Sequence, residues 1–192
     1  MGKMKIHNFI NCPVIIYDND NNYITKAIVE EYNKRDKSII VSEDLEHITQ
    51  AARLKVLIIH PGGATEFNGT RMRSFKGIIN KIELFNEQQR GARTAIRYQL
   101  DSPAAIRSFV VKSGQELLNP PLDVIVENIS SAGVLVKSPP GHLKINHILE
   151  IHVNIQDREI VLFGKITREK ANTDKTVSYG CKLIFPKKTT AA

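Results

Sequence analysis

The chain has 192 residues, 42% hydrophobic and 24% charged, and this ordinary globular composition excludes an intrinsically disordered protein. A formal net charge of +7 favours an anionic partner such as a nucleotide, a nucleic acid or an acidic protein face, although much of that charge is expected to be solvated surface. No apolar run approaches the length of a membrane span, and Cys12 and Cys181 lack the spacing of metal ligands.

The first residues of the chain bear on its location. Residues 1–10 lack an apolar core long enough for a signal peptide, and Ile6 stands where myristoylation at Gly2 requires Ser or Thr. The two distant cysteines suit a reducing compartment better than a disulfide framework. We therefore expect a cytoplasmic protein without membrane insertion.

Short apolar or β-branched runs, bounded by polar, Gly or Pro residues, predict strands in the first half. These strands cover residues 14–17, 23–31, 38–41 and 54–59, and residues 70–84 form one long strand or two successive ones. Residues 43–53 are expected to hold a short helix or a loop, and residues 60–63 a sharp turn. Five or six strands within about 80 residues predict a small β-barrel.

The polar residues 85–92 have no apolar period and predict a domain boundary, which divides the chain into residues 1–86 and 87–192. Beyond it, strands are predicted at residues 105–111, 123–126, 134–136, 149–155, 160–167 and 179–185. Residues 149–155 alternate strictly between apolar and polar, so one face of that strand is expected to be buried. The expected fold class is all-β, with two small barrels.

Two short strings in the second half have a defined chemistry. Arg93 and Arg97 form an RxxxR pattern, and residues 128–133 form [D/N]xSxxG with Asn128, Ser130 and Gly133. Residues four apart share one side of a strand or a helix, so the two arginines can contact one ligand. The second string is expected to join two antiparallel strands, where Asn and Ser shape the turn or face a ligand. Its glycine supplies either a positive φ or a bare surface.

In this order and spacing, the two strings resemble those of the PilZ family, receptors for the bacterial second messenger cyclic di-GMP. The resemblance covers about residues 88–186, and residues 164–168 and 179–185 resemble the late strands of that domain. The first half resembles the N-terminal split barrel of flagellar-brake-type proteins in strand pattern and position alone. Taken alone, the arginine pair is also typical of a solvated linker, and the second string of an ordinary hairpin turn. Their joint occurrence favours the family.

The resemblance implies a cyclic di-GMP site made by Arg93, Arg97, Asn128, Ser130 and Gly133, with Gln89, Arg90, Ser131 and Arg168 as further candidates. An arginine fork donates hydrogen bonds in pairs to phosphate oxygens or to the O6 and N7 atoms of guanine, and it also stacks on bases. The family often has two adjacent arginines at the start of the first string, whereas Ala92 precedes Arg93 here. This departure leaves a third cationic contact and the ligand stoichiometry open.

The resemblance also implies a receptor without catalysis or cofactor. Ligand would order residues 88–97 against the second barrel, change the arrangement of the domains and signal to a protein partner. Flagellar motility control is the favoured process, with the flagellar motor as a candidate partner and exopolysaccharide synthesis as the second process. The alternatives are a degenerate PilZ adaptor that binds proteins without nucleotide, and a nucleic-acid-binding barrel.

Other chemistries have little support in the sequence. Nucleic-acid-binding barrels use aromatic stacking platforms, but aromatic residues make up 6% of the chain and none is Trp. His142, His147 and His152 are spaced five apart, which puts neighbours on opposite faces of a strand and argues against a shared metal. No nucleophile elbow, Walker loop or paired carboxylate motif indicates an enzyme.

Overall fold

The computed structural model describes residues 8–49, 51–61, 63–72, 80–87, 97–111 and 114–184. Within these residues every regular element is a β-strand, so the predicted all-β class with two barrels is confirmed. Contacts between residues divide the chain into two units, Met1–Ile59 with Glu66–Gln88 and His60–Thr65 with Gln89–Ala192. The described residues include no helix long and apolar enough to cross a membrane.

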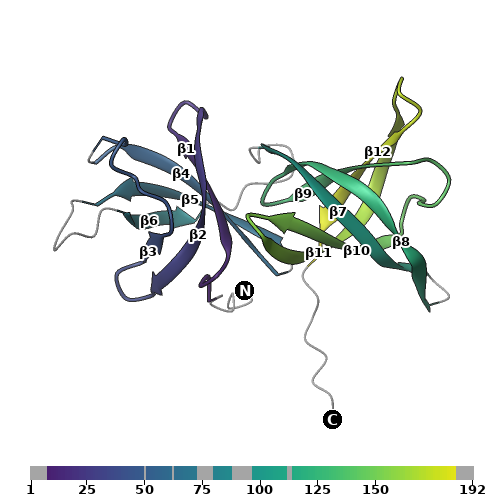
Figure 1. Ribbon diagram of the computed structural model, residues 1–192, viewed down its shortest axis with the longest axis horizontal. Coiled ribbons are helices and arrows are strands. Elements are labelled where there is room, and N and C mark those ends of the chain that lie inside the picture. Colours follow the sequence, from purple (N-terminus) through teal and green to yellow (C-terminus); the bar gives the residue numbers. More distant parts are fainter. Residues whose placement is uncertain are drawn as a thin grey trace, which may run out of the picture. The chain divides into compact units, whose positions relative to one another are not determined.

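The first barrel closes in the order β1-β2-β3-β6-β5-β4 (Figure 1). Its strands are β1 (Pro13–Asp18), β2 (Tyr23–Asn33), β3 (Ser38–Val41), β4 (Arg53–His60), β5 (Gly63–Arg71) and β6 (Lys81–Glu87). Alternate residues of β1 and β4, including Val14, Ile16, Val56 and Ile58, are fully buried in its core. Each such side chain contributes about 1.5–3 kcal/mol of burial free energy, which explains why these β-branched runs form strands.

Two parts of this barrel differ from or refine the sequence prediction. Strand β5 begins at Gly63 rather than at residue 70, because the chain turns after His60 and returns at once beside β4. Of residues 43–53, those that are described form turns and the start of β4, without a helix. Leu45 and Ile48 from these turns are buried in the core, and Arg71 donates hydrogen bonds to the carbonyls of Glu46 and Ile48.

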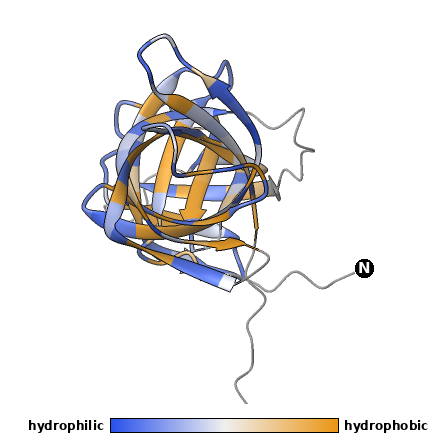
Figure 2. Cartoon of the chain, turned by 90° about the vertical axis from the view of Figure 1, so that its right-hand side faces the viewer, coloured by the Kyte–Doolittle hydropathy of each residue, from blue (hydrophilic) through white to orange (hydrophobic). Residues whose placement is uncertain are grey.

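The second barrel closes in the order β10-β11-β12-β9-β8-β7. Its strands are β7 (Tyr98–Val111), β8 (Gly114–Ile129), β9 (Gly133–Ser138), β10 (Ile148–Ile155), β11 (Arg158–Ala171) and β12 (Val177–Leu183). Leu149, Ile151 and Val153 of β10 are fully buried, which confirms one buried face of the alternating run. Along the strands, residues change repeatedly between hydrophobic and hydrophilic (Figure 2).

Strands β7 and β8 begin earlier than predicted. Pro103 lies inside β7, and Pro120 and Pro121 lie inside β8. Proline has no backbone N–H and normally marks the end of a ladder, so a sequence interpretation stops the strand there. Both strands continue because β7 and β8 pair along most of their length, with register shifts after Gln99 and Ile106.

The connection between the barrels follows β6. Phe67 pairs with Glu87, so β6 extends one residue past the predicted boundary between residues 86 and 87. The chain then runs through residues 88–97 to the start of β7 at Tyr98. Of this connection the structure describes Arg97, and the candidate residues Gln89, Arg90 and Arg93 lie outside the described residues.

Candidate ligand-binding site

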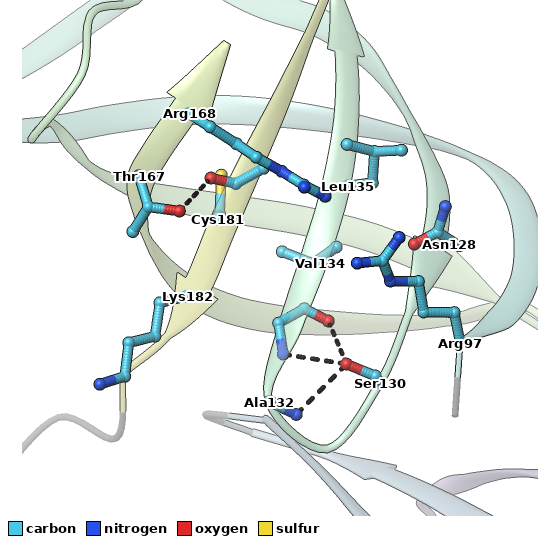
Figure 3. A pocket seen from close by; sticks show the side chains of 12 residues that line it. Arg97, Asn128, Ser130, Ala132, Val134, Leu135, Thr167, Arg168, Cys181 and Lys182 are labelled. Carbon is cyan, nitrogen blue, oxygen red and sulfur yellow. Dashed lines mark hydrogen bonds between the residues drawn. The ribbon is translucent and has the colours of Figure 1, made fainter. Parts of the chain in front are cut away.

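The second barrel has a cavity of about 480 Å³ on its outer wall, over β9 and β12. It is lined by Arg97, Asn128, Ser130, Ala132, Gly133, Val134, Leu135, Thr167, Arg168, Gly180, Cys181 and Lys182 (Figure 3). A volume of this size lies within the roughly 300–1,000 Å³ range of small-molecule sites. Five lining residues are candidates from the sequence: Arg97, Asn128, Ser130, Gly133 and Arg168. The structure therefore brings them together.

One cross-strand row runs through the cavity. Asn128 of β8 pairs with Leu135 of β9, Leu135 with Gly180 of β12, and Gly180 with Arg168 of β11. Directly opposed residues of antiparallel strands lie about 4.5–5.5 Å apart at their Cβ positions. Their neighbours Val134 and Tyr179 are buried in the barrel, so this row faces outward. Four strands thus supply the base of one site.

Ser130 shapes the turn between β8 and β9. Its hydroxyl accepts hydrogen bonds from the amides of Ala132 at 3.3 Å and Gly133 at 3.1 Å, and donates to the Gly133 carbonyl at 3.2 Å (Figure 3). The Ser130 amide also donates to the Gly133 carbonyl at 2.8 Å. Of the two roles left open for this serine, the geometry shows turn formation, which fixes the positions of Asn128 and Gly133.

Gly133 provides a bare surface rather than a positive φ. Its φ lies outside the left-handed region, whereas a Cβ atom at this position would lie 2.6 Å from the backbone oxygen of Cys181. Gly133 pairs with Lys182, and the absent side chain lets β9 and β12 approach closely there. Packing between backbones, not backbone conformation, therefore requires glycine.

Positive charge converges on the cavity. Among the described residues, the lining contains Arg97, Arg168 and Lys182 but neither Asp nor Glu. All three cationic residues are exposed, and within the described part of the chain none of them forms an ion pair. Figure 3 shows the guanidinium groups of Arg97 and Arg168 extending toward each other over β9. Like charges held close without a counter-charge favour an anionic ligand.

Asn128 and Ser131 differ in their access to this cavity. The Asn128 side chain lines it, is half-buried, and forms no hydrogen bond with any described residue. Its amide can therefore both donate and accept toward a ligand. The hydroxyl of Ser131 is buried without a hydrogen-bond partner among the described residues, and Ser131 is not part of the lining. The structure does not bring this candidate to the cavity wall.

Seven lining residues were not candidates from the sequence: Ala132, Val134, Leu135, Thr167, Gly180, Cys181 and Lys182. Gly180 and Lys182 lie two apart in the string 179–185, so strand alternation alone places both on the face opposite Tyr179. Thr167 donates a hydrogen bond to the Gly180 carbonyl at 2.9 Å. The position of Leu135 depends on its pairing with Asn128 and Gly180, for which the sequence carries no signal.

His147, His152 and Cys181 have surroundings in the structure that account for them without a metal or a catalytic role. His147 stacks on Phe109 with ring centroids 4.5 Å apart, and His152 lies 2.8 Å from carboxylate oxygens of both Glu150 and Glu159. No group of three or more potential metal ligands occurs among the residues that the structure describes. Burial raises the pKa of the Cys181 thiol to about 12, which keeps it protonated beside the cavity.

Comparison with known proteins gives one family match. The PilZ domain model matches residues 88–190. Among solved structures, the K. pneumonia MrkH complex with c-di-GMP shares 13% identity and a TM-score of 0.36, over 91% of this chain and 80% of that one. The Bacillus subtilis inhibitor of motility MotI/DgrA shares 13% identity and a TM-score of 0.35, over 91% and 88%. Escherichia coli YcgR in complex with c-di-GMP shares 10% identity and a TM-score of 0.36, over 91% and 76%. A comparison with curated proteins finds no match.

Proposed function

The chain belongs to the PilZ family, since the match to that domain spans residues 88–190, and from this premise we propose that it is a receptor for cyclic di-GMP. One observation carries the proposal. Arg97, Arg168 and Lys182, none of them ion-paired within the described residues, share one cavity with the amide of Asn128. A cyclic dinucleotide with two phosphates and two guanines matches this combination of cations and a hydrogen-bonding amide.

The proposed contacts follow from the chemistry of each group. Arg97, together with Arg93 of the same string, would donate paired hydrogen bonds to a phosphate or to a guanine O6/N7 edge. Asn128 would pair with a second polar edge of the base. Ser130 and Gly133 would act through the turn and through the close approach of β9 and β12 that keeps the surface bare.

The proposed role is binding without catalysis. A hydrolytic or transfer reaction needs a general base or a nucleophile within reach of the substrate. The described lining of the cavity has no imidazole and no carboxylate, and the thiol of Cys181 has a pKa of about 12. These residues bind and orient an anion but have no group suited to activate water.

The binding signal would pass through the connection between the barrels. Arg97 is the last residue before β7, and it lies at once on that connection and in the wall of the cavity. A ligand that binds Arg97 would favour the domain arrangements in which this arginine reaches the cavity. The size of the shift equals the difference between the ligand's affinities for these arrangements and for the others. The output would be altered contact with a protein partner, with motility control as the process implied by the family resemblance.

Isothermal titration of the full chain with cyclic di-GMP tests the receptor function. GTP and cyclic di-AMP serve as controls. Selective binding at micromolar affinity or tighter would support the proposal and give the stoichiometry that Ala92 leaves open. Absence of heat and of any thermal shift at high ligand concentration would contradict it. The remaining explanation for the fold would then be a protein-binding adaptor.

Small-angle X-ray scattering with and without cyclic di-GMP tests the interdomain part. We expect the pair-distance distribution to change on saturation, and to stay unchanged in an Arg97→Ala variant at the same ligand concentration. Identical curves for the free and saturated wild-type protein would show that binding leaves the domain arrangement as it was.

Loss of the gene tests the proposed process of motility control. It is expected to change swimming in the source organism, and unchanged swimming would argue against motility control.

A further inference from the structure

The side chain of Arg168 lies directly over Gly180. A Cβ atom added to Gly180 would lie 2.7 Å from Cγ and 3.1 Å from Cδ of Arg168, and would also collide with Nε. Three consecutive side-chain atoms close to one point show that the arginine passes over that point instead of pointing away from it. Gly180 is accordingly buried although it belongs to the outward-facing row of β12.

The position of this stem determines where the guanidinium lies. Arg168 begins on β11, crosses the strand β12 at Gly180, and extends over β9 toward Leu135 (Figure 3). A residue with a side chain at position 180 would occupy the path of the arginine. The missing side chain of Gly180 thus leaves room for the Arg168 side chain to lie against the sheet with its end in the cavity.

Arg97 has a different position in the same cavity. Its guanidinium comes from the opposite side and lies beside Asn128 (Figure 3). Its N–H groups can donate hydrogen bonds to a ligand in the cavity. The stem of Arg168 instead runs along the sheet, and the planar guanidinium at its end can lie against a planar base as well as donate hydrogen bonds.

We propose that Arg168 is the surface on which a guanine base of the ligand stacks, and that Gly180 is the positioning residue that lets the stem of this arginine lie along the sheet. The inference rests on the proposed cyclic di-GMP function and assigns a separate task to each arginine. Arg97 binds the phosphate charge and the hydrogen-bonding edge of a base, and Arg168 supplies a planar stacking surface with Leu135 beside it. Stacking of a base on a planar side chain changes affinity by about 5- to 100-fold.

Substitutions at Arg168 separate stacking from charge, measured by titration with cyclic di-GMP. Arg168→Lys keeps the charge and loses the plane, so we expect about 5- to 100-fold weaker binding. Arg168→Tyr keeps a planar surface and loses the charge, and we expect it to bind within about fivefold of the wild type. Wild-type affinity of the Lys variant, or equal losses in the Tyr and Ala variants, would overturn the stacking role.

Substitution of Gly180 tests the positioning role in a double-mutant cycle. Gly180→Ala is expected to weaken binding when Arg168 is present and to have no further effect in the Arg168→Ala background. A purely structural role of Gly180 would lower affinity by the same factor in both backgrounds, and that result would overturn the assignment. Thermal unfolding of each variant shows whether the barrel remains folded, and the Arg168 variants test the stacking independently if it does not.

The wild-type titration distinguishes failure of the proposed receptor function from failure of the stacking role alone. If the wild-type protein binds no cyclic di-GMP, the proposed function fails and the stacking role fails with it. If the wild-type protein binds selectively but Arg168→Lys binds equally well, the receptor function stands and only the stacking role is overturned.

Discussion

Arg97 offers the most direct test at the scale of single residues. Its side chain is exposed, lines the cavity and forms no ion pair within the described residues. Arg97→Ala is expected to cost about 1.5–3 kcal/mol of binding, the value of a hydrogen bond to a charged group. Titration should show a roughly tenfold to hundredfold weaker affinity. Folding should be unaffected, because an exposed side chain contributes little to stability.

The matched control is Arg158→Ala, which removes an exposed arginine of β11 that does not line the cavity. This variant is expected to bind like the wild type. Arg93→Ala, outside the described residues, is expected from the family resemblance to resemble Arg97→Ala. Full affinity in both the Arg93 and Arg97 variants would remove these residues from the site.

Gly133 gives a prediction about stability as well as binding. In Gly133→Ala the new methyl group would lie 2.6 Å from the Cys181 oxygen, so β9 and β12 must separate. Such overpacking costs about 1–3 kcal/mol, and urea unfolding measures it. Ser131→Ala in the same turn removes a hydroxyl that has no hydrogen-bond partner among the described residues, and it is expected to leave stability unchanged. A Gly133→Ala protein as stable as the wild type would contradict the close approach of the strands.

Part of the lining of this cavity could be anticipated from the sequence, and the rest could not, for a physical reason. Arg97, Asn128, Ser130, Gly133 and Arg168 belong to recognisable strings, and the structure places all of them around one cavity. Their contact with a ligand stays a prediction. Leu135 and Gly180 lie beside these residues only because of the way β8, β9, β12 and β11 pair. The register of strand pairing cannot be read directly from the sequence.

At the scale of elements, the hairpin of β11 and β12 carries a pH-dependent contribution. Asp174 lies 2.5 Å from the Lys137 ammonium and accepts hydrogen bonds from the amide and hydroxyl of Thr176. The hydrogen bonds from Lys137 and then Thr176 lower the pKa of Asp174 from 3.8 to about 2. Because the folded pKa is below the unfolded one, this contribution is present above about pH 4 and is lost as pH falls toward 2.

Urea unfolding of the wild type and of Asp174→Asn, from neutral pH down to about pH 2, checks this expectation. The wild type should be more stable above about pH 4, and the difference should close toward pH 2. A difference that stays constant over this range would show that the carboxylate charge is not its source.

The strands themselves were predictable where alternation was strong. Residues 149–155 alternate in sequence and form β10. The starts of β5, β7 and β8 were missed because glycine, proline and polar residues at those positions normally end strands. In a closed barrel every strand has two neighbours, and hydrogen bonding along both edges overrides such weak local preferences.

At the scale of the whole molecule, ligand binding is expected to act on one barrel. Every described lining residue lies between Arg97 and Lys182, in the second unit. Cyclic di-GMP at about 100 times its Kd should stabilise that barrel by about 2.7 kcal/mol. Hydrogen exchange followed by mass spectrometry should show slower exchange in β8, β9 and β12. Protection confined to peptides of the first barrel would place the site elsewhere.

The arrangement of two barrels followed from counting predicted strands, and the structure confirms that class. The sequence predicted a boundary between residues 86 and 87, in a polar stretch. Strand β6 continues to Glu87, and the division by contacts assigns His60–Thr65 to the second unit. A short hairpin tip such as this has no compositional signal, because contacts and not residue types decide to which unit it belongs.

The cavity lies on the outer wall of a barrel whose interior is filled by buried side chains such as Ile106, Leu162 and Ile166. A messenger can therefore enter and leave without any opening of the core. Arrival would be accelerated by the positive rim, and the lifetime of the complex would depend on the contacts alone. The strength of those contacts, and not a conformational gate in the barrel, would then decide how closely the bound fraction follows a change in messenger concentration.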